Sequence, residues 1–153
     1  MWGSRFDVYI EGEVDMRFMV LVKANKDSEA GVLPSEQELI EMGKFNDKLI
    51  AAGVMLAGEG LRESAKGAKL RFAQGKKTVI DGPFTESKEL IAGFWMIQAA
   101  SLAEAIDLFS GAPFVDGELE IRQVFESADF DPVIKTDEGR AMLAAEDEFR
   151  KRS

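Results

Sequence analysis

The chain has 153 residues, with 28 acidic and 19 basic side chains, a formal net charge of −9, and neither cysteine nor histidine. These absences exclude disulfide bonds, thiolate nucleophiles, imidazole-dependent triads and zinc sites built from cysteine or histidine, so no metal or cofactor is expected. The acidic balance also argues against nucleic acid and anionic membrane surfaces as partners, because both attract basic proteins.

The ends of the chain differ in character from its middle. Residues 1–15 contain four carboxylates and no apolar run like that of a signal peptide, so we expect an N-terminal extension and a cytoplasmic location. No stretch approaches the roughly 20 apolar residues that cross a bilayer. Residues 16–126 hold the regular elements and are expected to form the domain. Residues 127–153 are expected to form an acidic linker followed by a C-terminal helix.

The first half of the domain predicts a strand, a loop and a helix. Residues 18–22 are a short apolar run typical of a strand, and polar residues 25–33 indicate a loop. Ser35 and Glu38 have the spacing of a capping box, after which apolar residues recur at helical intervals. Gly53 stands where a glycine commonly ends a helix.

The second half predicts further strands and a second capped helix. Strands are expected at residues 54–57, 70–73, 78–80, 91–97 and 118–125, and a helix is expected to begin at Ser101. The strands on either side of Gln74, Gly75, Lys76 and Lys77 form a predicted hairpin. The order β-α-β, hairpin, β-α-β favours an α+β, ferredoxin-like sandwich with both helices on one face of an antiparallel sheet.

Two of the predicted strands are apolar on both faces. Residues 18–22 and 91–97 show this pattern, whereas two helices can cover only one side of the sheet. We therefore expect a second copy of the chain to cover the other side, giving a homodimer packed sheet to sheet. The alternative is that the terminal extensions fold over that face.

The densest group of chemically active side chains spans residues 81–89. Asp81 and Glu86 are candidate catalytic residues, because a carboxylate in a cleft can donate or accept a proton when burial raises its pKa. The alternative is structural: Asp-Gly-Pro is good turn chemistry, Phe84 would belong to the core, and Glu86 would face solvent.

Two other residues are candidate ligand contacts. Glu59 lies between two glycines at a predicted strand end, where pockets often open, although the glycines could simply permit a bulge. Arg122, on the same predicted strand face as Glu118 and Glu120, could bind a carboxylate with its planar guanidinium, although a cross-strand surface ion pair is the alternative.

The sequence Asp-Gly-Pro-Phe-Thr-Glu-Ser-Lys-Glu at residues 81–89, followed by Ile-Ala-Gly-Phe-Trp at 91–95, resembles the signature of the YCII-related family, specifically its DGPF branch. Residues 16–22, 52–61 and 120–122 are also similar to that family, so the resemblance covers about residues 16–126. The resemblance implies a dimeric α/β barrel, in which two ferredoxin-like chains pack sheet to sheet. It also implies that Met16 is the family-like start.

The resemblance leaves the activity open, because the family is largely unassigned. Some YCII-like relatives are enzymes acting on small compounds and are thought to use a His–Asp pair, and this chain keeps a carboxylate at Asp81 but has no histidine. The DGPF branch also resembles modules associated with bacterial sigma factors. We therefore favour a small-molecule-binding or sensor homodimer, over a carboxylate-based enzyme or a purely structural interaction module. Its cleft is expected to be lined by Gly82, Pro83, Phe84, Glu59 and Arg122.

Overall fold

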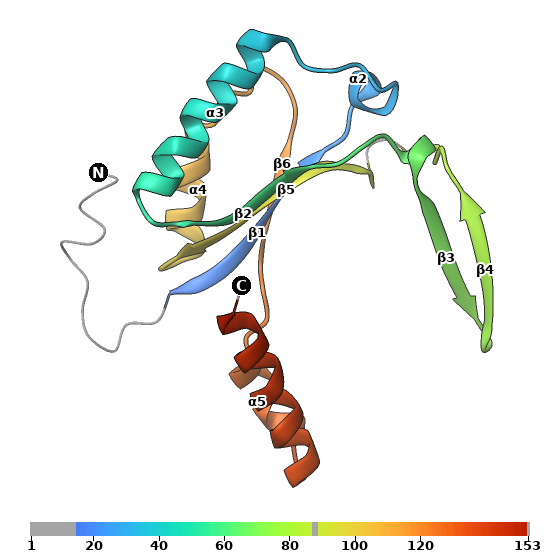
Figure 1. Cartoon of the computed structure of the whole chain (residues 1–153), viewed down its shortest axis with the longest axis vertical. Helices are drawn as coiled ribbons and strands as arrows, with labels where there is room; N and C mark the ends of the chain where they lie inside the picture. Colours follow the sequence, from blue (N-terminus) through green and yellow to red (C-terminus); the bar gives the residue numbers. More distant parts are fainter. Residues whose placement is uncertain (1–14, 87–88, 153) are drawn as a thin grey trace. The chain divides into compact units, whose positions relative to one another are not determined.

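A computed structural model describes residues 15–86 and 89–152 (Figure 1). Its main sheet has four strands in the order β2-β5-β1-β6, and every neighbouring pair is antiparallel. The strands are β1 (Met16–Lys23), β2 (Met55–Gly60), β5 (Ile91–Ala99) and β6 (Leu119–Gln123). The two strands predicted to be apolar on both faces, β1 and β5, are therefore the central pair.

Two long helices connect the strands of the main sheet in the expected way. Helix α3 (Glu36–Ala51) lies between β1 and β2 in the chain, and α4 (Leu102–Ser110) lies between β5 and β6. Both pack on the same face of the sheet, as Figure 1 shows. The element and strand orders confirm the predicted ferredoxin-like α+β fold.

One hydrophobic core joins this sheet face to the helices. Its buried members are Phe18, Val20, Phe45, Leu49, Ala52, Val54, Trp95, Ile97, Ala99, Ala105, Leu108 and Phe109. The Trp95 ring meets Phe45 and Phe109 edge to face, and its Nε1 donates a hydrogen bond to Asn46 Oδ1 at 2.9 Å. Trp95 is thus a core residue with its polar atom satisfied.

The helix ends follow the predicted local chemistry, with one addition. Ser35 and Glu38 form the capping box, and Gly53 has a φ of +72°, which favours glycine. The predicted loop before α3 contains a one-turn helix, α2 (Lys26–Glu29), capped by Asn25 and Ser28. A helix of four residues is too short to show hydrophobic periodicity, which explains why the sequence pattern missed it.

The predicted hairpin is present but has a tighter turn. Strands β3 (Ala68–Ala73) and β4 (Lys76–Asp81) form a separate two-stranded sheet joined by Gln74 and Gly75 alone. These two residues have φ values of +50° and +78°, the left-handed conformation that two-residue hairpin turns require. The lysines expected in the loop therefore begin β4 instead.

The second face of the main sheet carries a row of apolar side chains. The strand register places Met19 opposite Met96 and Leu21 opposite Phe94, and all four are half-buried. Helices α3 and α4 both pack on the other face. Strands β1 and β5 therefore carry apolar side chains on both faces, as expected. The homodimer inferred from that expectation stays a prediction.

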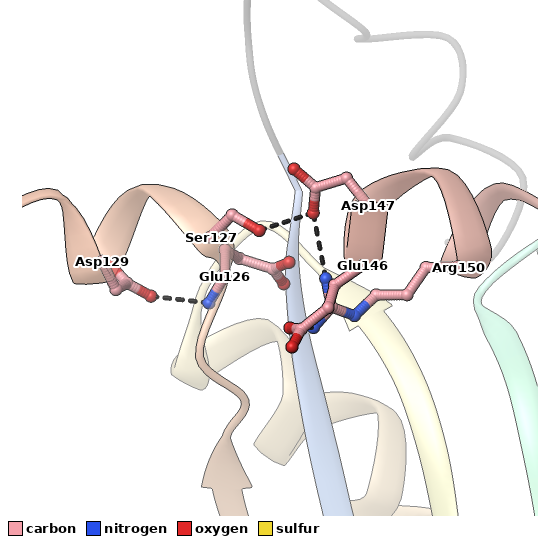
Figure 2. Close-up of polar contacts among 6 residues, drawn as sticks. All are labelled: Glu126, Ser127, Asp129, Glu146, Asp147 and Arg150. Carbon is pink, nitrogen blue, oxygen red and sulfur yellow. Dashed lines mark hydrogen bonds and ion pairs between the residues drawn. The ribbon is translucent and has the colours of Figure 1, made fainter. Parts of the chain in front are cut away.

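The chain divides after Gln123 into two compact units, the second of which begins at Val124. The second unit contains a 3-10 helix, η3 (Ser127–Val133), within the predicted linker, and the predicted C-terminal helix as α5 (Asp137–Lys151). Figure 2 shows the contact that joins η3 and α5: the Ser127 hydroxyl donates to Asp147 Oδ1 at 2.5 Å.

Among the described residues, no helix is both long and apolar enough to cross a membrane. The cytoplasmic location stays a prediction.

Candidate functional site

An open pocket of about 290 Å³ lies where β2 ends and β5 begins. Its wall combines apolar and charged side chains from four segments of the chain. The lining residues are Glu29, Leu61, Arg62, Ser64, Phe84, Glu89, Leu90 and Ile91. The pocket thus joins α2, the short 3-10 helix η1 (Ser64–Lys66), and the loop that carries the 81–89 motif.

Ser64 connects the three segments that form the polar side of this pocket. Its amide donates to Glu29 Oε2 at 3.0 Å, and its hydroxyl donates to Glu29 Oε1. The same hydroxyl oxygen accepts a hydrogen bond from the Phe84 amide at 3.0 Å. Because a serine hydroxyl has one proton, Ser64 retains none to offer a ligand while it binds Glu29.

The glycine of the motif is required by a close backbone approach. A Cβ atom at Gly82 would lie 1.7 Å from the Ser64 carbonyl oxygen, which leaves room for no other residue. The Gly82 amide donates to the Gly67 carbonyl at 3.1 Å, and the Gly82–Pro83 peptide is cis. Gly82 and Pro83 therefore shape the loop against η1 and do not line the pocket.

Phe84 is the motif residue that reaches the pocket. It is half-buried, and Lys69 of β3 places its Nζ 4.2 Å from the centre of the Phe84 ring. A cation over an aromatic face stabilises an exposed site by about 0.5–1 kcal/mol. The ring thus lies between Lys69 of the hairpin and the pocket, and its role in ligand binding stays a prediction.

The two predicted catalytic carboxylates lie outside the pocket lining. Asp81 ends β4 opposite Ala68, and both Asp81 and Glu86 are exposed. Neither is among the residues that form the pocket wall. Their role in acid–base chemistry stays a prediction without support from this geometry.

Glu59 and Arg122 lie on the second face of the main sheet, at opposite edges. Glu59 of β2 pairs with Phe94, and Arg122 of β6 pairs with Met19, so the central strands separate them. Arg122 Nη1 lies 3.4 Å from Glu120 Oε2 on the same strand, so its ion pair is within β6 and not the cross-strand pair expected as its alternative role. The structure therefore does not bring Glu59 or Arg122 to the pocket.

Glu120, the carboxylate beside Arg122, makes a shorter ion pair with Lys23 of β1. Lys23 Nζ lies 2.7 Å from Glu120 Oε1. This hydrogen bond and the charge of Lys23, assisted by Arg122, hold the pKa of Glu120 below its usual 4.5. Glu120 is therefore firmly ionised at neutral pH and unsuited to proton transfer there.

Comparison with known proteins now decides the family. The family model of the YCII-related domain matches residues 16–128. The chain belongs to the YCII-related family. An uncharacterised protein of Rhizobium meliloti (strain 1021) is 34% identical over 90 residues, covering 57% of this chain and 73% of the relative.

Sequence reasoning missed part of the pocket of this YCII-related chain. Glu29 and Ser64 are 35 residues apart, and no local pattern signals their contact. Arg62 also lines the pocket, whereas Arg71 lies on the hairpin, outside the lining. The Asn25 and Ser28 capping pair was the one available signal, since it marks the turn that carries Glu29.

The described part of this YCII-related chain offers polar contacts rather than a metal centre. In residues 15–86 and 89–152, no three acidic side chains lie close enough together to hold a metal ion. The chemical resources of the pocket are one guanidinium, two carboxylates and an apolar wall. This arrangement can bind a small molecule that has both an apolar body and a polar end.

Proposed function

We propose that this chain is a small-molecule-binding or sensor module of the DGPF branch, whose ligand occupies the pocket beside Phe84. The observation that carries the proposal is the position of Phe84, which lines a pocket together with Arg62 and Glu89. The rest of the motif supports that position, because Gly82 allows the loop to approach η1 and Ser64 binds the Phe84 amide.

The chemistry of the wall defines the ligand class. Leu61, Phe84 and Ile91 provide apolar surface, while Arg62 provides five donors in a planar fork suited to a carboxylate. The volume of about 290 Å³ is close to the lower end of the range for small-molecule sites, roughly 300–1,000 Å³. We therefore propose a small, partly aromatic or aliphatic carboxylate as the ligand.

The polar groups of the pocket are better suited to binding a ligand than to catalysing a reaction. The Ser64 hydroxyl is bonded to Glu29, and the chain has no histidine to activate it as a nucleophile. The alternative, a carboxylate-based enzyme, would need Asp81 and Glu86 at the substrate, and both lie outside the pocket wall.

We further propose that the second sheet face forms a homodimer. Met19, Leu21, Phe94 and Met96 form an apolar centre, and Glu59, Glu120 and Arg122 lie on the flanking strands. An apolar centre with a charged rim is the usual composition of a stable interface. A second copy with the same surface satisfies this pattern with two-fold symmetry.

The pocket proposal is tested by ligand screening with a matched pair of arginine variants. Titration of the isotope-labelled chain with a library of small carboxylates is expected to shift the NMR signals of Phe84 and Ile91. Arg62→Ala is expected to weaken the best binder about ten-fold or more, as loss of a charge-assisted hydrogen bond does. Arg71→Ala removes an exposed arginine outside the pocket and is expected to leave affinity unchanged. Equal losses in both variants, or no shift at Phe84, would contradict the proposal.

A further inference from the structure

The β3–β4 hairpin exposes an apolar face. Leu70, Phe72 and Val79 are 57%, 72% and 60% exposed. The register places Leu70 directly opposite Val79, and Phe72 lies two residues further along the same side, so the three side chains share one face. A two-stranded hairpin is marginally stable in water unless its apolar face packs against something. This face therefore requires a cover.

The hairpin is also a basic segment of an acidic chain. Residues 68–81 contain four basic side chains and one acidic one, a net charge of +3, although the whole chain carries −9. Lys77 lies opposite Phe72 and therefore on the apolar face, and Lys76 is its neighbour at the tip. A surface that covers this face should be apolar and acidic.

The same chain carries a segment of that composition, formed by α4 and the loop that follows it. Residues 102–118 contain four acidic side chains and no basic one. Leu102, Ile106 and Val115 are exposed apolar residues in this segment, and Val115 is 97% exposed. Asp107 and Asp116 lie beside them in sequence and are themselves exposed. Within residues 15–86 and 89–152, neither aspartate is engaged in an ion pair.

Within one copy, the hairpin and the start of α4 lie at opposite ends of β5, and only the end of the following loop, at Glu118, returns to the hairpin end. Strand β5 runs from the hairpin end of the sheet at Ile91 to the start of α4 after Ala99, and its nine residues span about 30 Å. Figure 1 shows the hairpin projecting beyond the sheet, away from α4. A second copy can present its α4 surface to the hairpin without this constraint.

We propose that the hairpin is a docking arm, and that its apolar face packs on residues 102–118 of a second copy of this chain. Phe72 and Leu70 cover Ile106 and Val115 there, while Lys77 faces Asp107 and Asp116 from the apolar side and Lys76 adds its charge at the tip from the other face. This contact is separate from the proposed dimer through the second sheet face, because α4 lies on the opposite side of the sheet.

Charge-reversal variants of the full chain test the docking arm, with self-association measured by sedimentation velocity. Lys76→Glu with Lys77→Glu is expected to weaken self-association about ten-fold or more, and Asp107→Lys with Asp116→Lys should do the same. An equimolar mixture of these two double variants is expected to recover association, because the reversed charges complement one another. Lys151→Glu with Arg152→Glu is the matched control, since it makes the same charge change at adjacent exposed residues of α5 and its cap.

Crosslinking provides an independent measurement. The chain has no cysteine, so Phe72→Cys with Ile106→Cys introduces the only thiols present. Oxidation is expected to give covalent dimers, whereas Phe72→Cys alone should give few.

The proposal is overturned if the lysine variant associates like the unmodified chain, or if folded double variants fail to complement. Loss of association in Leu21→Asp but not in the lysine variant would overturn the arm alone and leave the sheet-face dimer standing. Ligand binding at Phe84 is read separately by NMR.

Discussion

The Ser64 hydroxyl oxygen accepts a hydrogen bond from the Phe84 amide at 3.0 Å, although the two residues are 20 positions apart. This contact holds the motif loop against η1, while the Ser64 hydroxyl donates its own hydrogen bond to the Glu29 carboxylate on α2. The position of Phe84 in the pocket wall therefore depends on two residues outside the motif.

Ser64→Ala should destabilise the chain. The substitution leaves the half-buried Phe84 amide without its acceptor, which costs about 1–2 kcal/mol in the free energy of unfolding. Urea unfolding measures the loss, and faster hydrogen exchange at the Phe84 amide locates it. Ser110→Ala is the control, because its exposed hydroxyl bonds only to the Ile106 carbonyl within α4 and the change should stay within about 0.5 kcal/mol. Unchanged exchange at Phe84 would contradict the assigned role of Ser64.

Two glycine-to-alanine substitutions should have effects of opposite sign. Gly82→Ala places a methyl group against the Ser64 backbone and should destabilise the chain by about 1–3 kcal/mol. Gly43→Ala lies within α3, where the new methyl group meets no atom within 4 Å, and should stabilise by about 1 kcal/mol. Melting temperatures compare the two. A neutral Gly82→Ala would show that the loop does not lie against η1 as described.

The core depends on α3 through Leu49, which is fully buried against the sheet. Leu49→Ala should cost about 2–5 kcal/mol in the free energy of unfolding, because it removes buried methyl groups and leaves a cavity. The adjacent Ile50 is 59% exposed, so Ile50→Ala should cost less than about 1 kcal/mol. Similar losses at the two positions would mean that the helix faces the sheet differently.

The low pKa of Glu120 gives a pH-dependent contribution to stability. The folded-state pKa lies below the unfolded value, so the stabilisation is present above the unfolded pKa of about 4.5 and is lost as the pH falls through the folded pKa. NMR titration of the Glu120 carboxyl group should show a raised pKa in Lys23→Met, because Lys23 is the main cause of the shift. Lys44→Met, which removes a lysine from α3, should leave that titration unchanged.

The proposed sheet-face dimer predicts a strong effect at Phe94. Phe94→Glu would place a charge in the apolar centre of each copy, opposite Leu21, and should increase the dimer dissociation constant at least 100-fold. Sedimentation equilibrium measures the change. Leu39→Glu introduces the same charge at an exposed position on α3 and should leave the dimer intact. A Phe94→Glu chain that remains a dimer would exclude this face as the interface.

Local chemistry made most of the fold predictable. The Ser35 and Glu38 capping box, the left-handed Gly53 and the apolar runs of β1 and β5 each depend on neighbouring residues, and all are confirmed. The hairpin was predicted with too long a loop, because the sequence does not reveal that Gln74 adopts a positive φ. The α2 helix was missed because one turn has no periodicity.

The site was less predictable because it is assembled from distant segments. Of the predicted site residues in the 81–89 motif, Phe84 lines the pocket, whereas Asp81 and Glu86 lie outside it. Their roles in binding or catalysis stay predictions. The polar contacts come from Glu29, Arg62 and Ser64, and the pairing of Ser64 with Glu29 has no local signature.

The sequence by itself determined the elements, their order, the two-sided central strands and the absence of imidazole and thiol chemistry, because each of these depends on residue type and short-range spacing. Only the tertiary structure decided which polar groups meet at Phe84, because hydrogen bonds between residues 20 and 35 positions apart form only after α2, η1 and the motif loop come together. The tertiary structure also separated Glu59 from Arg122, since strand order places β2 and β6 at opposite edges of the sheet.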